Sequence, residues 1–216
     1  MTSRLPPLRP QDLDEQQRAL YAQITGGRRA QGPELFPLTD QQGALHGPFN
    51  ALIHAPSVGS AMSRLGEVIR YESSLTAQIR EIAILAVAAH HRSDFEWYAH
   101  ERVGRHIGLT DTEIERLRHL EPLKECTTEE IAAYDLVRAV LRHRDVPDDT
   151  YQQAVQQLGR TVTVELVMLV GYYQALALLL SAFRLPAPQD VAWPALEGDR
   201  DPPLTTEHGR EGPSSS

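Results

Sequence analysis

Apolar residues recur along most of this chain at the spacing of an α-helix. Ile131, Tyr134, Val137 and Leu141, for example, follow one another at steps of three or four positions, which places them on one helix face. Few stretches alternate apolar and polar residues as a half-buried strand would. The pattern therefore predicts an all-α fold.

A second pattern marks where helices begin. In a capping box, a Ser or Thr side chain accepts from the backbone amide of a Glu three residues later, and that Glu accepts from the amide of the Ser or Thr. Three pairs fit this pattern: Ser93 with Glu96, Thr110 with Glu113, and Thr127 with Glu130. Together with the apolar spacing, they predict helices over residues 12–24, 57–72, 75–91, 94–107, 111–119, 128–144, 147–158 and 161–183.

Two segments lack helical spacing. Residues 25–48 hold five glycines and three prolines, which is typical either of a lid or binding loop or of a linker, and the pattern does not decide between them. From residue 186 on, prolines stand among charged and small residues and the chain ends in three serines, a composition typical of disorder. We therefore expect one helical domain over residues 1–185 and a disordered tail over residues 186–216.

Charge and composition restrict the partners. The 21 Lys and Arg against 29 Asp and Glu give a net charge of -8, which would repel a nucleic-acid backbone. The uncharged run over residues 166–181 is shorter than the roughly 20 residues that a membrane-spanning helix needs, so we expect a buried or subunit-interface helix and no membrane. Because Cys126 is the single cysteine, no intrachain disulfide can form, and a cytoplasmic location is the expectation.

One carboxylate stands where a buried helix is predicted. Residues 79–89 are apolar on every side except for Arg80 and Glu81, which is typical of a helix that is buried all round. Burial should raise the pKa of Glu81, and such carboxylates are often functional. Pairing with Arg80 or with a residue elsewhere in the fold is the structural alternative.

The following helix carries a second group of polar residues. Ser93, Glu96 and His100 are three and four positions apart and therefore share one helix face. They form either part of a site or a capping box in which His100 merely pairs with Glu96. From these residues alone the capping box is the better interpretation.

The order of several motifs resembles the carboxymuconolactone decarboxylase and AhpD-like family. These motifs are Arg-Glu with its aliphatic run, Phe-Glu-Trp-x-x-His and Gly-Leu-Thr within residues 75–109, then residues 47–52, His54-x-Pro56 and the late Gly171-Tyr172-Tyr173. The resemblance covers roughly residues 4–185. It implies an AhpD-like helical fold with a central antiparallel hairpin, and a homo-oligomer that is a trimer or hexamer.

In the peroxidase branch of that family, a Glu is followed after eleven residues by Cys-x-x-Cys and, three residues later, by a His. Glu81 and His100 match the Glu and the His, whereas Ser93 and Glu96 occupy the two cysteine positions. Serine cannot form a disulfide and glutamate cannot attack a peroxide. The resemblance therefore implies no thiol peroxidase activity. Cys126 does not stand at either of the two cysteine positions of the family motif.

The decarboxylase branch also lacks these cysteines, and its lactone chemistry needs no cofactor or metal. We therefore expect a cofactor-independent lyase or isomerase that acts on a small cyclic carboxylate or lactone, with proton transfer through Glu81, Glu96 and His100. Further candidates for substrate binding are Ser93, Trp97, His46, Asn50, His54, Tyr172 and Tyr173.

Two other hypotheses remain open at this stage. The chain is a non-catalytic ligand-binding or scaffolding oligomer if its redox site has decayed to a capping box. It is a metal-dependent enzyme if Glu81, Glu96 and His100 converge on one ion. The absence of a Glu-x-x-His pair of the ferritin-like kind on a second helix ranks the metal enzyme last.

Overall fold

The computed structural model describes residues 2–28, 31, 35–142, 145–188 and 191–194. Within these residues the regular structure is helical, and the only β-type contact is an isolated bridge between Thr39 and Leu45. In chain order the elements are a short 3-10 helix (Pro10–Asp12), α1 (Glu15–Gly26), α2 (Pro48–His54), α3 (Pro56–Tyr71), α4 (Ala77–His91), α5 (Asp94–Ile107), α6 (Asp111–Arg118), α7 (Thr128–Arg142) and α8 (Asp148–Phe183).

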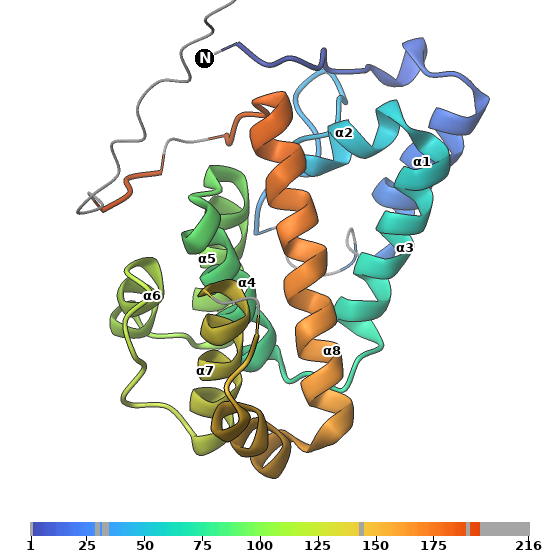
Figure 1. The fold of residues 1–216 in the computed structure, drawn as a ribbon. Coiled ribbons are helices and arrows are strands. Elements are labelled where there is room, and N and C mark those ends of the chain that lie inside the picture. Colours follow the sequence, from blue (N-terminus) through green and yellow to red (C-terminus); the bar gives the residue numbers. More distant parts are fainter. Residues whose placement is uncertain (1, 29–30, 32–34, 143–144, 189–190, 195–216) are drawn as a thin grey trace, which may run out of the picture.

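The helix α4 lies at the centre of the fold. It packs against α5, α6, α7 and α8, and its residues from Ile82 to Ala88 are buried almost completely. The long α8 runs beside this group and separates it from α1, α2 and α3 (Figure 1). The predicted all-α architecture with a central α4–α5 hairpin is confirmed.

Local signals explain most helix boundaries. The capping boxes of Thr110 with Glu113 and of Thr127 with Glu130 both form, so α6 and α7 begin where the sequence predicts. The two helices predicted over 147–158 and 161–183 meet at Gly159, whose φ of 79° is outside the helical region, so α8 consists of two helices joined at a kink. The sequence pattern missed α2, because its seven residues are too few to show periodicity.

The described part of the C-terminal segment is tied to the domain. The indole of Trp193 stacks edge-on against Trp97, with ring centroids 5.4 Å apart, and Arg92 donates to the carbonyl oxygen of Pro194 at 3.0 Å. Arg118 donates to the carbonyl oxygen of Ala192. Residues 191–194 therefore pack on the helices beyond the predicted domain end, whereas residues 195–216 of the predicted tail lie outside the described residues.

Among the described residues, α8 is also the one helix long and apolar enough to cross a membrane by length and composition. Core helices of globular proteins meet the same criterion. Here α8 packs along α4 and α7, and Leu166, Leu169 and Val170 are buried in that contact. Its apolar character is thus explained in part by the core.

Gly47, which directly precedes α2, packs closely against Phe95 of the α4–α5 hairpin. Its φ is 56°, and an added Cβ would lie 2.4 Å from the ring of Phe95. We expect Gly47→Ala to lower the free energy of unfolding by about 1 to 3 kcal/mol, because backbone strain adds to the clash. Gly26→Ala is the control, because an added Cβ there meets nothing within 4 Å. Urea unfolding should show little change in the free energy of unfolding for this control. Equal losses in both variants would contradict a special role of Gly47.

Candidate active site

The hairpin of α4 and α5 positions the central polar residues. Thr76 caps α4 by accepting from the amide of Ile79 at 3.2 Å, and Arg92 ends it in the left-handed conformation. The chain then reverses and α5 begins at Asp94. As a result, Glu81 on the first helix and His100 on the second lie side by side in the interior.

Glu81, His100 and Glu96 form a buried chain of three ionisable side chains. Nδ1 of His100 lies 2.6 Å from Oε2 of Glu81, and Nε2 of the same ring lies 3.5 Å from Oε2 of Glu96. All three residues are at most 3% exposed. Two carboxylates thus flank one imidazole on its two nitrogen atoms.

The charge state of Glu81 follows from its surroundings. Burial works to raise its pKa, but the adjacent His100 and the nearby Arg70 and Arg80 outweigh burial, so the pKa of Glu81 lies below its usual value. The ionised carboxylate accepts a hydrogen bond, so Nδ1 of His100 carries the proton between them. Nε2 is the nitrogen that is left to exchange a proton with Glu96.

Glu96 differs from Glu81 in its hydrogen bonding. Its Oε1 is buried without a hydrogen-bond partner. Burial and the neighbouring Glu81 raise the pKa of Glu96 more than His100 and Arg70 lower it. The side chain therefore tends to hold a proton, and it has one oxygen atom with no protein partner.

Arg70, near the end of α3, brings a positive charge to this group. Burial works to lower the pKa of Arg70, but the charge of the nearby Glu81 carboxylate outweighs it, so the pKa lies above its usual value and the guanidinium stays protonated. Burial raises the pKa of the Tyr173 phenol well above its usual value, and its ring meets the imidazole of His100 edge-on at 5.2 Å. Sequence reasoning missed Arg70, because no spacing links it to residues 81–100.

Glu96, His100 and Arg70 share a small cavity of about 20 Å³, which has room for about one water molecule. Its remaining walls are mostly aromatic and apolar. They are Phe36, Pro48, Phe49, Phe95, Ala99, Tyr172, Tyr173 and Leu176. Phe36 and Pro48 thus belong both to the outer wall and to residues 25–48, the segment for which the sequence predicted either a lid or a linker.

The structure brings only some of the predicted substrate-binding residues to this cavity. Tyr172 and Tyr173 line it. Asn50 and His54 instead hold the N-terminal segment, because both lie within hydrogen-bond distance of the carbonyl oxygen of Pro6. Trp97 is fully buried and donates to Glu101.

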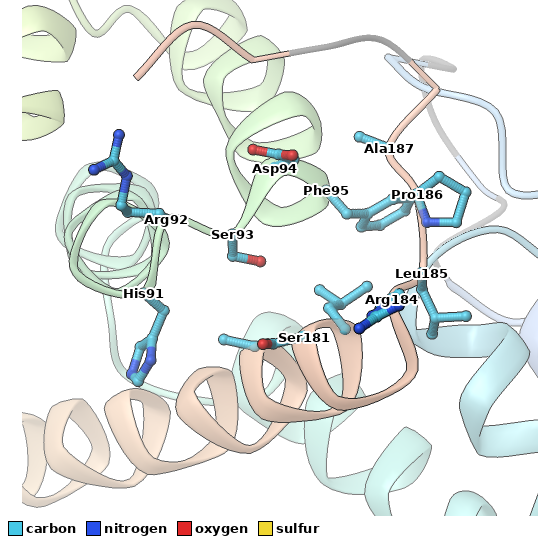
Figure 2. Close-up of a pocket in the computed structure, with 12 residues that line it drawn as sticks. His91, Arg92, Ser93, Asp94, Phe95, Ser181, Arg184, Leu185, Pro186 and Ala187 are labelled. Atoms are coloured by element: carbon cyan, nitrogen blue, oxygen red, sulfur yellow. The ribbon is translucent and has the colours of Figure 1, made fainter. Parts of the chain in front are cut away.

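His46 and Ser93 also lie apart from the cavity. The backbone amide of His46 donates to the carbonyl oxygen of Leu38, and the residue is not among those that line the cavity. Ser93 lines a different pocket, shown in Figure 2. The predicted capping box of Ser93 with Glu96 is not formed, since α5 has no side-chain cap, and the reason is that the Glu96 side chain turns inward to His100.

The geometry does not suit a metal ion. Glu81 and Glu96 bind opposite nitrogen atoms of the His100 ring, so the three side chains do not converge on one point. In the part of the chain that the structure describes, no group of three or more His, Cys, Asp or Glu side chains is arranged to hold a metal. The arrangement suits proton transfer instead.

The raised pKa of Glu96 has a consequence for stability. A carboxyl whose folded pKa lies above its ordinary value of 4.5 stabilises the fold at low pH, and this contribution is lost as the pH rises through the folded pKa. The free energy of unfolding of Glu96→Gln relative to that of the natural protein should therefore increase as the pH rises above 4.5. Urea unfolding of both proteins between pH 4 and pH 8 measures this; a difference that stays constant or shrinks would contradict it.

The fold is all-helical and of the AhpD-like type. The model of the carboxymuconolactone decarboxylase family matches residues 56–142, which span α3 to α7. This part of the chain is similar to that family. The match supports a family-level catalytic or AhpD-like role and does not specify the reaction, and no curated protein matches the chain significantly.

Two solved structures share the fold. One is a protein of unknown function from Agrobacterium tumefaciens, provisionally described as the antioxidant defence protein AhpD; it is 19% identical with a TM-score of 0.60, over 65% of this chain and 97% of the other. The second is a cysteine-to-alanine variant of the debrominase Bmp8 in complex with 2,3,4-tribromopyrrole, 10% identical with a TM-score of 0.64, over 86% of this chain and 92% of the other. At these identities the likeness concerns the fold alone.

Proposed function

We propose that this protein is a cofactor-independent lyase or isomerase that transfers a proton to or from a small cyclic carboxylate or lactone. The observation that carries the proposal is the unpaired Oε1 of Glu96 in a cavity that also holds Arg70 and His100. A buried acid with one free oxygen, next to a base, is what proton transfer to carbon requires.

Each polar residue has a role in this proposal. Glu81 holds the proton on Nδ1 of His100 and so fixes the orientation of the ring. Nε2 of His100 and Glu96 share a proton, and Glu96 delivers it to the substrate carbon or removes it from there. Arg70 binds the substrate carboxylate, because its guanidinium can donate two parallel hydrogen bonds to such a group.

The walls of the cavity support a flat, ring-shaped substrate. Phe36, Phe95 and Tyr172 supply apolar and aromatic surface, which is typical of sites for small organic molecules. A cavity of about 20 Å³ is too small for such a ring. The proposal therefore requires that the wall formed by residues 36–49 moves outward when substrate enters.

The test is an assay for multiple turnovers. Purified protein is incubated with carboxymuconolactone and related lactones, and the loss of substrate and release of carbon dioxide are followed over time. Turnover that falls in Glu96→Gln and His100→Ala supports the proposal. Unchanged turnover in both variants would remove these residues from the mechanism.

The alternative is a non-catalytic ligand-binding or scaffolding oligomer. Its motivation was a capping box that explained Ser93 and Glu96 structurally, and this box is not formed. Saturable binding of a lactone in the same assay without any product would favour this alternative over the lyase.

We further propose that the protein, which we expect to be cytoplasmic, is a homo-oligomer that associates through α8. Val164, Met168 and Leu178 are 53%, 60% and 61% exposed, and their spacing places them on one face of the helix. Contiguous exposed apolar surface of this kind often marks an interface. The resemblance to the family adds a trimer or hexamer as the expected size.

Met168→Glu tests the α8 interface. A charge at the centre of an apolar contact should lower the apparent mass to that of the monomer, because the carboxylate would be desolvated on association. Size-exclusion chromatography with light scattering measures the mass. Tyr151→Glu, at a 48% exposed position before the kink of the same helix, is the control; a variant at Met168 that keeps the mass of the natural protein would exclude this face.

A further inference from the structure

A second pocket, of about 400 Å³, lies on the other side of the first turn of α5. It is bordered by the turn between α4 and α5, by the last turn of α8 and by the residues that follow α8 (Figure 2). Phe95 lines this pocket as well as the small cavity next to Glu96. The two spaces are thus separated by one aromatic ring.

Hydrogen-bond donors without acceptors face this pocket. Ser93 precedes α5 and is 7% exposed, and its Oγ is buried without a hydrogen-bond partner. The hydroxyl points into the space between α5 and α8 (Figure 2). Because no side chain caps α5, the first amides of this helix also lack the acceptor that a cap would supply.

Positive charge prevails along the pocket walls. Arg92 and Arg184 line it together with a single acidic residue, Asp94. The carboxylate of Asp94 accepts from the indole of Trp193, and Arg92 donates to a backbone carbonyl of the C-terminal segment. Arg184 makes no ion pair within the described residues, and it lines the pocket at the end of α8 (Figure 2).

The backbone at the two arginines is unusual. Arg92 and Arg184 end α4 and α8 with φ values of 49° and 51°, a conformation in which glycine is strongly favoured after a helix. Within the described residues, Leu120 is the only other residue besides glycines with positive φ. Arginine thus stands at two positions of one pocket where glycine would adopt the left-handed backbone conformation more easily.

Hydrogen bonds cover some of the carbonyl oxygens at the C-terminal ends of these helices. The carbonyl oxygens of Ala88 and Leu180 accept from the amides of Ser93 and Leu185. Arg4 covers the end of α8 further, because it donates to the carbonyl oxygens of Ala182 and Phe183. At the N-terminus of α5, by contrast, no side chain caps the helix.

We propose that this pocket binds an oxyanionic group of a small molecule, a phosphate or a carboxylate, through the Ser93 hydroxyl, the N-terminal amides of α5 and the guanidinium of Arg184. Helix N-termini and guanidinium groups both favour such groups. This site is separate from the cavity of Glu96 and His100 and does not depend on the function proposed for that cavity.

Arg184→Gly is the most direct test. Glycine suits the left-handed conformation at this position, so the variant should fold at least as well as the natural protein. Sodium phosphate and sodium acetate are titrated separately at constant ionic strength, and the backbone amide resonances of residues 93–96 are followed by NMR. Saturable shifts are expected with at least one anion, and the dissociation constant should rise at least tenfold in Arg184→Gly.

Two further variants complete the test. Ser93→Ala should also weaken binding, because it removes the unpaired hydroxyl. Arg160→Gln removes an exposed charge from α8 at a point 24 residues before Arg184, about 36 Å along the helix at 1.5 Å per residue, and should leave binding unchanged. The proposal is overturned if neither anion shifts these amides saturably, or if Arg184→Gly binds as tightly as the natural protein.

Discussion

His100→Ala should lower the free energy of unfolding by about 3 to 5 kcal/mol, the range found when a buried charged side chain loses its partner. His100 is the closest partner of Glu81, with 2.6 Å between Nδ1 and Oε2. Without it, the carboxylate would stay buried with only a 3.4 Å contact to Arg80 and the more distant charge of Arg70. Urea unfolding at pH 7, followed by circular dichroism, measures the loss.

Glu81→Gln is the matched control for this prediction. It removes the charge that needs compensation but keeps the size of the side chain, so the loss should be smaller than in His100→Ala. In a Glu81→Gln background, His100→Ala should lower the free energy of unfolding by less than it does in the natural protein, because no buried carboxylate is left without its partner. A single His100→Ala variant within 1 kcal/mol of the natural protein would show that the pair does not matter for stability.

The second large effect concerns turnover. If the proposed proton transfer is right, Glu96→Gln should lower kcat for a lactone substrate by about 10²- to 10⁴-fold, the usual contribution of a general acid or base. KM should change little, because glutamine has the same size. Steady-state kinetics on the best substrate from the lactone series provides both constants.

Two other positions separate proton transfer from binding. Arg70→Gln should mainly raise KM, because Arg70 is proposed to hold the substrate carboxylate. Glu101→Gln is the control on the same helix; Glu101 accepts from Trp97 and Arg105 away from the cavity, so kcat should stay unchanged. If Glu96→Gln and Glu101→Gln show the same kcat, Glu96 is not the proton donor.

The helices were largely predictable because their signals are local. The Thr110 and Thr127 boxes set two helix starts, and the apolar residues from Ile82 to Ala88 indicated the buried centre. The juxtaposition of Glu81 and His100 followed from the family resemblance rather than from spacing. Their hydrogen bond depends on how α4 and α5 pack, which the pattern within each helix does not encode.

The rest of the site depends on contacts between distant parts of the chain. Arg70 reaches the cavity from α3 and Phe36 from the segment before α2, and neither stands in a motif with Glu96. At Ser93 the local pattern was present but predicted the wrong contact. Its spacing to Glu96 fits a capping box, but the attraction of Glu96 to His100 in the core prevails over this local pattern.

The outer wall of the cavity differs from the inner wall in how it is held. The inner wall is part of the hairpin core, whereas Phe36 and Phe49 in the outer wall are only partly buried. Segments with few buried contacts open at lower free energy than the core. In hydrogen exchange, the amide of Phe36 should therefore exchange before those of α4, and solvent would reach Glu96 and His100 through movement of this outer wall while the hairpin stays folded.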